Sequence, residues 1–166
     1  MARVVYTVGD DISTDVIYPG RYMATVLPTE TPQYAFVDDA EFNAKLNGGE
    51  VPKGSVLVGG KNFGCGSSRE QAVSCLKGWD LTIVAPSFAR IFLQNAINLG
   101  LNVLTVLDIE ASEGDELEIE THRVVNKTTG KNFPVEPLPK SRQAIIDAGG
   151  LIPYTRTRVL EVAGKA

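Results

Sequence analysis

Cysteine and histidine are scarce in this sequence. Its 166 residues contain two cysteines, Cys65 and Cys75, and one histidine, His122. Two cysteines cannot form a disulfide framework, and in a reducing compartment we expect both to be free thiols. No pair of histidines has metal-ligand spacing, so we expect no metal site built by this chain alone. His122 is interpreted as an exposed sheet residue, and no Gly-x-Ser-x-Gly elbow is present, which argues against a Ser-His-Asp hydrolase.

Long apolar runs and an excess of basic residues are also missing. Apolar stretches such as residues 55–60 and 81–86 are far shorter than the roughly 20 residues that cross a bilayer, and the N-terminus lacks the pattern of a signal peptide. We therefore expect a cytoplasmic protein that contacts no membrane. Sixteen Lys and Arg residues against 20 Asp and Glu give a net charge of -4, which argues against bulk nucleic-acid binding.

What is present is the composition of an ordinary globular protein, with 43% hydrophobic and 22% charged residues. We expect residues 1–166 to form a single domain. Strand-like and helical stretches alternate from residue 51 to 106, which predicts an α/β fold with a mostly parallel core sheet. The central strands are continuous apolar runs, as expected when both faces of a sheet are covered. The expected core strands span residues 3–8, 55–59, 81–84 and 101–106, and the strands of a β-ribbon span residues 115–120, 122–126 and 131–135. The expected helices span residues 38–46, 67–77, 87–99 and 141–148, and the last helix is expected to end at Gly149-Gly150.

The most specific local signal is a glycine-rich loop, residues 59–70, that follows a buried strand and precedes a helix. Ser67 and Glu70 have the spacing of a capping box, which predicts Ser67 at the N-cap with Ser68 and Arg69 in the first turn. Such a helix start favours an anion, and Arg69 adds a planar fork suited to carboxylates. The alternative is a capped helix with a solvated Arg69. The loop lacks the lysine of a P-loop and the third glycine of a dinucleotide loop, which argues against a nucleotide as the anion.

Two further segments suggest loops. Residues 10–20 mix acids, hydroxyls and apolar residues without helical period and end at Pro-Gly, so we expect an ordered loop of the kind that often carries function. Its aspartates, Asp10, Asp11 and Asp15, have no EF-hand spacing, and turn or capping roles are commoner for such residues. Residues 22–32 contain two prolines and suggest a mobile connection, which makes a lid over the substrate plausible.

Three motifs together resemble the small subunit, or swivel domain, of the aconitase and isopropylmalate dehydratase family. They are DISTDVIYPGRY at residues 11–22, NFGCGSSRE at residues 62–70, and SFARIF followed by NAINLGL within residues 87–101. The resemblance covers most of residues 3–106. It implies a swivel-domain-like β/β/α barrel-like domain with a mostly parallel core sheet and a β-ribbon.

The resemblance also implies a chemistry, namely a dehydratase-isomerase that moves a hydroxyl between adjacent carbons of a malate-type acid. Ser67 matches the general base, whose alkoxide removes a proton from carbon, and Ser68 and Arg69 match binders of a substrate carboxylate. Asp15 matches an active-site aspartate with an orienting or proton-relay role. A serine hydroxyl is too weak an acid to act unaided, and the expected helix start beside Arg69 offers a means of holding the alkoxide. Backbone from Gly64, Cys65 and Gly66 forms the loop, while Ser13 and Thr14 are expected to order the neighbouring one.

A [4Fe–4S] cluster is the other catalytic part that the resemblance implies, and its open iron binds the substrate hydroxyl and carboxylate. Such a cluster usually takes three thiolates, but this chain has two cysteines. We therefore expect a large subunit to carry the cluster, this chain to bind none, and the two to form a heterodimer or heterotetramer. Alone, the chain is expected to be inactive.

The choice of substrate depends on the residues after the Pro-x-Arg-Tyr motif. Homoaconitase-type chains tend to read Tyr-Leu-Arg-Thr there, with the arginine meeting a distal carboxylate, whereas this chain has Met23 and Ala24. A small dicarboxylic hydroxy acid with an alkyl group, such as isopropylmalate of leucine biosynthesis, is favoured. Packing against the barrel or the partner is the alternative role for both residues. This chain has Gln71 where the family's Ser-Arg-Glu-His run has histidine, which weakens the assignment of one particular substrate. The alternative functions are a hydro-lyase of 2,3-dimethylmalate, of methylmalate or citraconate, or of homoaconitate, and a non-catalytic anion-binding module.

Overall fold

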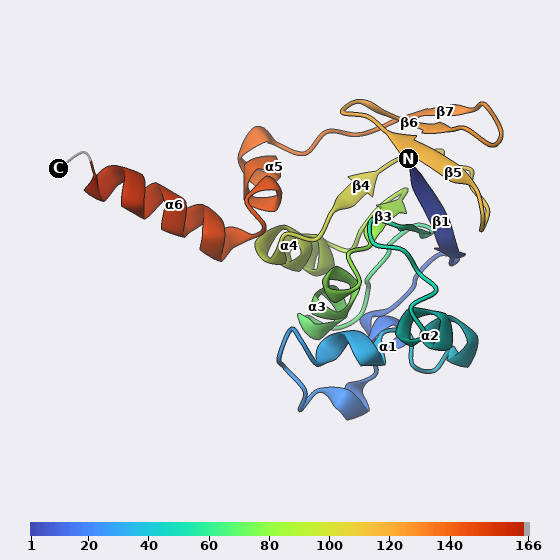
Figure 1. Ribbon diagram of the computed structural model, residues 1–166, viewed down its shortest axis with the longest axis horizontal. Helices are drawn as coiled ribbons and strands as arrows, with labels where there is room; N and C mark the ends of the chain where they lie inside the picture. Colours follow the sequence, from blue (N-terminus) through green and yellow to red (C-terminus); the bar gives the residue numbers. More distant parts are fainter. Residues whose placement is uncertain (165–166) are drawn as a thin grey trace.

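The computed structural model describes residues 1–164, and its centre is one curled sheet with strand order β4-β3-β2-β1-β5-β6-β7 (Figure 1). The first four strands pair in parallel and the last three are antiparallel. Their bounds are β1 Ala2–Thr7, β2 Val56–Val58, β3 Thr82–Ala85, β4 Val103–Thr105, β5 Glu116–Ile119, β6 Arg123–Asn126 and β7 Asn132–Pro134. An isolated bridge between Thr105 and Glu136 brings the segment after β7 back to the β4 edge. The predicted barrel-like α/β fold, with its parallel core and its β-ribbon, is thereby confirmed.

Alternate residues of the parallel strands enter two separate hydrophobic cores. Leu57 and Ile83 are fully buried with the helices on one face, whereas Val56 and Val84 are fully buried on the other face, inside the curl of the β-ribbon. This explains why these strands read as continuous apolar runs, since each side chain is removed from water whichever way it points.

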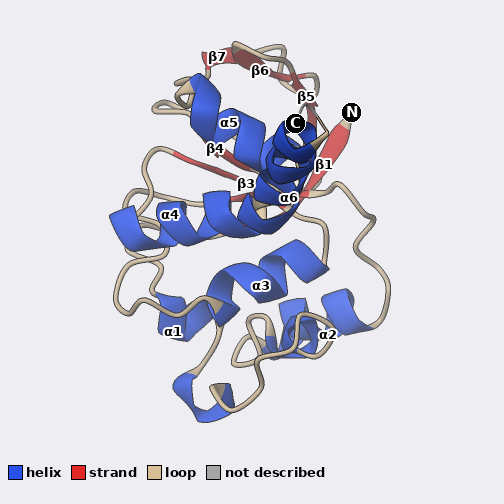
Figure 2. Cartoon of the chain, turned by 90° about the vertical axis from the view of Figure 1, so that its left-hand side faces the viewer, coloured by secondary structure: helices blue, strands red, loops and turns tan. Residues whose placement is uncertain are grey.

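Helices cover one face of the parallel strands, with α3 and α4 next to the sheet and α1 beyond α3 (Figure 2). Helix α2 packs on β1, where the Phe42 ring stacks on the Tyr6 ring. Each crossover places the end of a strand and the start of the next helix at the carboxyl edge of the sheet. The helix bounds are α1 Thr14–Ile17, α2 Ala40–Asn47, α3 Gln71–Gly78, α4 Arg90–Leu99, α5 Lys140–Asp147 and α6 Leu151–Ala163. Two 3₁₀ turns, Gly20–Tyr22 and Thr31–Tyr34, interrupt the segment that the sequence suggested to be a mobile connection.

The helix expected at residues 141–148 is α5, and it ends before Gly149-Gly150 as predicted. It is not the last helix, however, because α6 begins at Leu151 and extends away from the body (Figure 1). Gly150 is the N-cap of α6 at φ 125° and packs against the end of α4. The glycine pair therefore turns the chain between two helices. No helix within residues 1–164 has both the length and the hydropathy that a membrane span requires.

Candidate functional site

Two loops meet beyond the carboxyl ends of β1 and β2 and form the candidate site. Residues 12–14 lie beside residues 64–65 as a short parallel pair, in which Gly64 N–H donates to the Ile12 carbonyl at 2.7 Å and Thr14 N–H donates to the Cys65 carbonyl at 2.8 Å. Gly64 has a φ of 79° and no room for a Cβ atom against the Phe92 ring. The glycine thus lets the loop pack tightly on α4 while its backbone pairs with the other loop.

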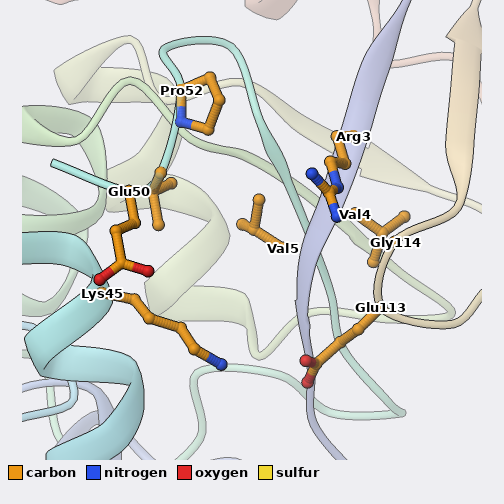
Figure 3. Close-up of a pocket in the computed structure, with 9 residues that line it drawn as sticks. Arg3, Val4, Val5, Lys45, Glu50, Pro52, Glu113 and Gly114 are labelled. Atoms are coloured by element: carbon orange, nitrogen blue, oxygen red, sulfur yellow. The ribbon is translucent and has the colours of Figure 1, made fainter.

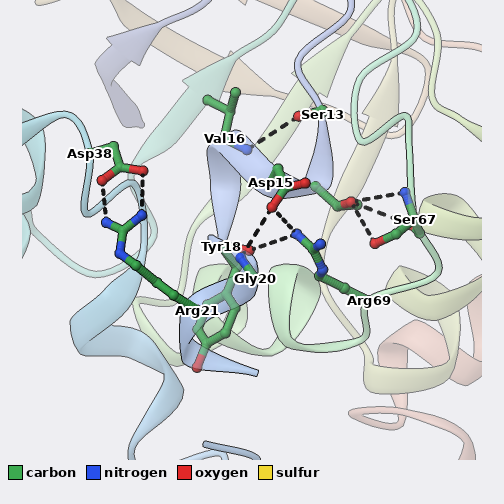
Figure 4. A network of polar contacts seen from close by, with 10 residues as sticks. Ser13, Asp15, Val16, Tyr18, Gly20, Arg21, Asp38, Ser67 and Arg69 are labelled. Atoms are coloured by element: carbon green, nitrogen blue, oxygen red, sulfur yellow. Dashed lines mark hydrogen bonds and ion pairs between the residues drawn. The ribbon is translucent and has the colours of Figure 1, made fainter. Parts of the chain in front are cut away.

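Ser67 follows this paired segment after Gly66 and is exposed (Figure 4). Its hydroxyl and its backbone N–H are both hydrogen-bonded to the Thr14 hydroxyl. The two hydroxyl oxygens are 3.0 Å apart, and Ser67 N–H donates to Thr14 Oγ1 at 3.1 Å. Gly66, with a φ of 96°, provides the reversal that aims Ser67 N–H back at the other loop.

Asp15 and Arg69 form an ion pair between the two loops, and Arg69 also donates to the Tyr18 carbonyl at 3.3 Å (Figure 4). The Asp15 carboxylate accepts from Gly20 N–H at 3.1 Å as well. The hydrogen bond from Arg69, followed by the one from Gly20, holds the pKa of Asp15 below its usual value. The carboxylate is 64% exposed whereas the Arg69 side chain is only 14% exposed. Asp15 is therefore a charged clamp that fixes the direction of the guanidinium.

Both hydrogen bonds of this guanidinium come from Nη1. Arg69 Nε is buried and has no hydrogen-bond partner among residues 1–164. A buried donor without a partner costs about 1–3 kcal/mol, so the guanidinium keeps an unmet capacity for an anion. A carboxylate is the natural acceptor for such a planar fork.

The predicted capping box is wrong. Helix α3 begins at Gln71, its N-cap residue is Glu70, and no side chain within the described range bonds to that cap. Ser67 to Arg69 form an irregular segment because Ser67 is committed to Thr14 and Arg69 to Asp15. The alkoxide that the resemblance assigns to Ser67 is therefore not held by the N-terminus of a helix.

The expected substrate-contacting residues lie close to this segment. The Ser68 side chain is exposed, and its carbonyl accepts from Asn95 of α4 at 3.2 Å. The carbonyl of Met23 accepts from Gln71 Nε2 at 3.2 Å, which ties the 3₁₀ turn to the start of α3. Met23 is 47% exposed and Ala24 is also exposed. Both side chains are therefore open to a ligand or to a partner.

Arg21 belongs to the same motif but is engaged within the chain. Its guanidinium makes two hydrogen bonds to Asp38 (Figure 4). It also lies 4.8 Å from the centre of the Tyr22 ring. These contacts join the turn after α1 to the segment before α2. Arg21 thus supports the loop that carries Asp15.

The thiols of this chain do not fit a cluster site. Cys75 is fully buried in the core, and burial raises the pKa of its thiol, which opposes the thiolate form that binds iron. The Cys65 thiol, in the glycine loop, donates to the Asp11 carbonyl at 3.3 Å. Within residues 1–164 no three His, Cys, Asp or Glu side chains gather as a metal site would require.

Other features of the molecule lie apart from the site. His122 is exposed in the turn between β5 and β6, outside the strand in which the sequence placed it. A pocket of about 310 Å³ lies near the amino end of β1, where Arg3 and Lys45 face Glu50 and Glu113 (Figure 3). The pocket is at the opposite end of the parallel strands from Ser67, so it is no part of the candidate site.

Thr14 is the site residue whose role sequence reasoning missed. It was expected only to order its loop, but its hydroxyl contacts both the backbone and the side chain of Ser67. The position of Thr14 directly before the motif aspartate was a usable signal, but its burial, at 2% exposure, is seen only in the structure. Its partner was not predictable, because the contact spans 53 residues of sequence.

Comparison with known proteins agrees with this geometry. The profile of the family described as "Aconitase C-terminal domain" matches residues 11–108, and the chain belongs to this family. It is 44% identical to the 3-isopropylmalate dehydratase small subunit of Moorella thermoacetica over 160 residues, which cover 93% of each chain. It is 42% identical to the isopropylmalate/citramalate isomerase small subunit of Methanocaldococcus jannaschii, over 95% of this chain and 94% of the other.

A solved structure shows the same fold over the whole length. The crystal structure of 3-isopropylmalate dehydratase from Methanocaldococcus jannaschii superimposes with a TM-score of 0.90 at 38% identity, and covers 99% of this chain and 98% of that one. The resemblance read from the three motifs is thus confirmed, and it extends to the C-terminal third.

Proposed function

We propose that this chain is the small subunit of 3-isopropylmalate dehydratase, a hydro-lyase that interconverts 2- and 3-isopropylmalate by dehydration and rehydration in leucine biosynthesis. The observation that carries the proposal is the convergence of an exposed serine hydroxyl and a clamped arginine at one edge of the sheet. Small subunits of that name are similar to this chain over more than nine-tenths of its length.

Ser67 is the general base in this proposal. Its alkoxide takes the proton from the substrate carbon, while Arg69 and Ser68 bind a carboxylate of the same substrate. Asp15 holds Arg69 in a fixed direction, so the carboxylate and the reacting carbon are placed relative to Ser67 before reaction.

A large subunit is the proposed partner. Ser67 and Ser68 are exposed in this chain, whereas an alkoxide and its substrate need a site from which water is excluded. The partner supplies the other wall, and it also carries the [4Fe–4S] cluster, for which residues 1–164 of this chain provide no ligand set. We place the complex in the cytoplasm, where free thiols such as Cys65 stay reduced.

The substrate is proposed to be an alkylmalate. Met23 and Ala24 carry no charge for a second distal carboxylate, and their exposure leaves an apolar surface beside the site. Hydro-lyases of 2,3-dimethylmalate, of methylmalate or citraconate and of homoaconitate share the same chemistry and are the alternatives. The name of the Methanocaldococcus jannaschii relative adds citramalate to the substrates that need testing.

The test is reconstitution with the large subunit of the same organism under anaerobic conditions. Dehydration is followed by absorbance on isopropylmalate, dimethylmalate, citramalate and homocitrate, and each subunit is also assayed alone. We expect turnover only with both subunits present and a preference for isopropylmalate. Preference for another acid would contradict the proposed substrate, and a cluster-loaded complex that turns over none of the four would favour an anion-binding module.

A further inference from the structure

The Thr14 hydroxyl makes contacts to Ser67 that a purely structural threonine does not need. Its Oγ1 lies 3.0 Å from Ser67 Oγ and accepts the Ser67 backbone N–H at 3.1 Å. Thr14 is 2% exposed whereas Ser67 is exposed, so the threonine hydroxyl is shielded from water on the side of the core while the Ser67 hydroxyl faces the open side of the site.

The number of protons and lone pairs restricts how this pair can be bonded. A threonine hydroxyl has one proton and two lone pairs, and the Ser67 N–H occupies one lone pair. The single Thr14 proton then has two acceptors on Ser67, the Oγ atom at 3.0 Å and the carbonyl oxygen at 3.5 Å. While Ser67 keeps its own proton, it donates to the remaining lone pair, and the Thr14 proton turns to the carbonyl.

The arrangement reverses when Ser67 is an alkoxide. Ser67 Oγ then has no proton to donate, so the Thr14 proton turns to it at 3.0 Å. We propose that Thr14 is the hydroxyl donor that stabilises the Ser67 alkoxide, an inference that rests on the proposed function. Because the stronger bond forms only to the charged state, Thr14 lowers the energy of the alkoxide more than that of the neutral serine.

The proton count of the reaction is consistent with this role. The alkoxide takes the proton from the substrate carbon, the electron pair of that C–H bond becomes the π bond, and hydroxide leaves the adjacent carbon with the C–O pair. Ser67, now neutral, donates to Thr14 until rehydration, in which hydroxide adds to the carbon that lost the proton, the π pair forms the new C–H bond with the Ser67 proton at the carbon that lost hydroxide, and Ser67 is an alkoxide again. Thr14 neither gains nor loses a proton, so its hydroxyl only rotates.

The fold directs this bond and offers no helix end in its place. Helix α3 starts at Gln71 and its N-cap residue is Glu70. Ser67 therefore does not lie at the N-terminus of the helix, where the first N–H groups could have stabilised its alkoxide. Instead the pairing of residues 12–14 with residues 64–65 sets the register, and Gly66 turns Ser67 towards Thr14. The donor is therefore in place before substrate binds, as oxyanion stabilisation requires.

The test compares Thr14→Val, which keeps the shape and removes the hydroxyl, with Thr14→Ser, which keeps the hydroxyl. Ser13→Ala is the matched control, because Ser13 caps α1 through Val16 N–H in the same loop. Each variant is purified with the large subunit, and kcat, KM and the pH dependence of kcat are measured on isopropylmalate. Gel filtration and thermal unfolding of each complex report assembly and folding.

We expect Thr14→Val to lower kcat on the order of a hundredfold, the effect of losing one oxyanion donor, with KM nearly unchanged. The acid limb of its pH profile shifts to higher pH, since the alkoxide becomes harder to form, while Thr14→Ser and Ser13→Ala keep the wild-type limb. An unshifted limb in Thr14→Val overturns the inference. If Thr14→Val fails to assemble, Thr14→Ala takes its place under the same criterion. A wild-type complex without turnover on any malate-type acid refutes the proposed function itself, and this role with it.

Discussion

Replacing Gly64 by alanine tests how the glycine loop is held against α4. Two costs add. The φ of 79° costs an L residue about 1–2 kcal/mol, and the new Cβ would overlap the Phe92 ring, which is 1% exposed and lies 5.3 Å, centroid to centroid, from Phe63. Overpacking of this kind costs about 1–3 kcal/mol. We therefore expect Gly64→Ala to lower the free energy of unfolding by about 2–5 kcal/mol.

Urea unfolding followed by circular dichroism measures this loss, with the m-value as a check that the transition stays two-state. Gly114→Ala is the matched control, because Gly114 also has a positive φ, 93°, but nothing lies within 4 Å of its added Cβ. The control should lose only the backbone cost, about 1–2 kcal/mol. Equal losses in the two variants would show that the loop does not pack on Phe92 as described.

Three further predictions concern charge, substrate choice and the core. Arg69 holds the pKa of Asp15 below 3.8, so the ion pair stabilises the fold above pH 3.8, and this stabilisation is lost as the pH falls through the lowered pKa. An NMR titration of Arg69→Gln should show the pKa of the Asp15 carboxyl return towards 3.8, and an unchanged pKa would exclude Arg69 as the cause. Ala24→Arg should raise kcat/KM for homoaconitate relative to isopropylmalate, because the new guanidinium can meet a distal carboxylate, and a ratio equal to wild type would remove this position from the specificity argument. Leu76→Ala removes a side chain with no exposure and should lower the free energy of unfolding in urea by about 2–5 kcal/mol. Leu107→Ala removes a side chain that is 55% exposed and should lower it much less. Similar losses in the two variants would contradict the described core.

The parts of the fold that the sequence predicts are those set by local pattern. Apolar runs located the parallel strands within a few residues, since both faces of the sheet are buried. Helix α6 was missed because Gly149-Gly150 has the pattern of a helix end, while its actual role depends on packing against the end of α4. That contact is tertiary and leaves no local signal.

The site shows the same division. The motifs located Ser67, Arg69 and Asp15, and the structure brings them together, although their roles stay proposals. The capping box was misjudged because Ser67 has a competing partner, Thr14, in a distant segment. The hydrogen bond from Ser67 N–H to Thr14 fixes the backbone of Ser67 outside the helix, so the local preference of serine for an N-cap position does not decide the structure here.

Ser67 is proposed to be the base of a hydro-lyase site that a large subunit completes. The most direct measurement is kcat of the anaerobically reconstituted complex with Ser67→Ala, beside Ser141→Ala, an exposed serine of α5, as control. We expect both variants to assemble with the large subunit, Ser141→Ala to keep wild-type turnover, and Ser67→Ala to lose at least about 10²-fold in kcat, the lower range for a general base. An assembled Ser67→Ala complex with wild-type kcat would contradict that role.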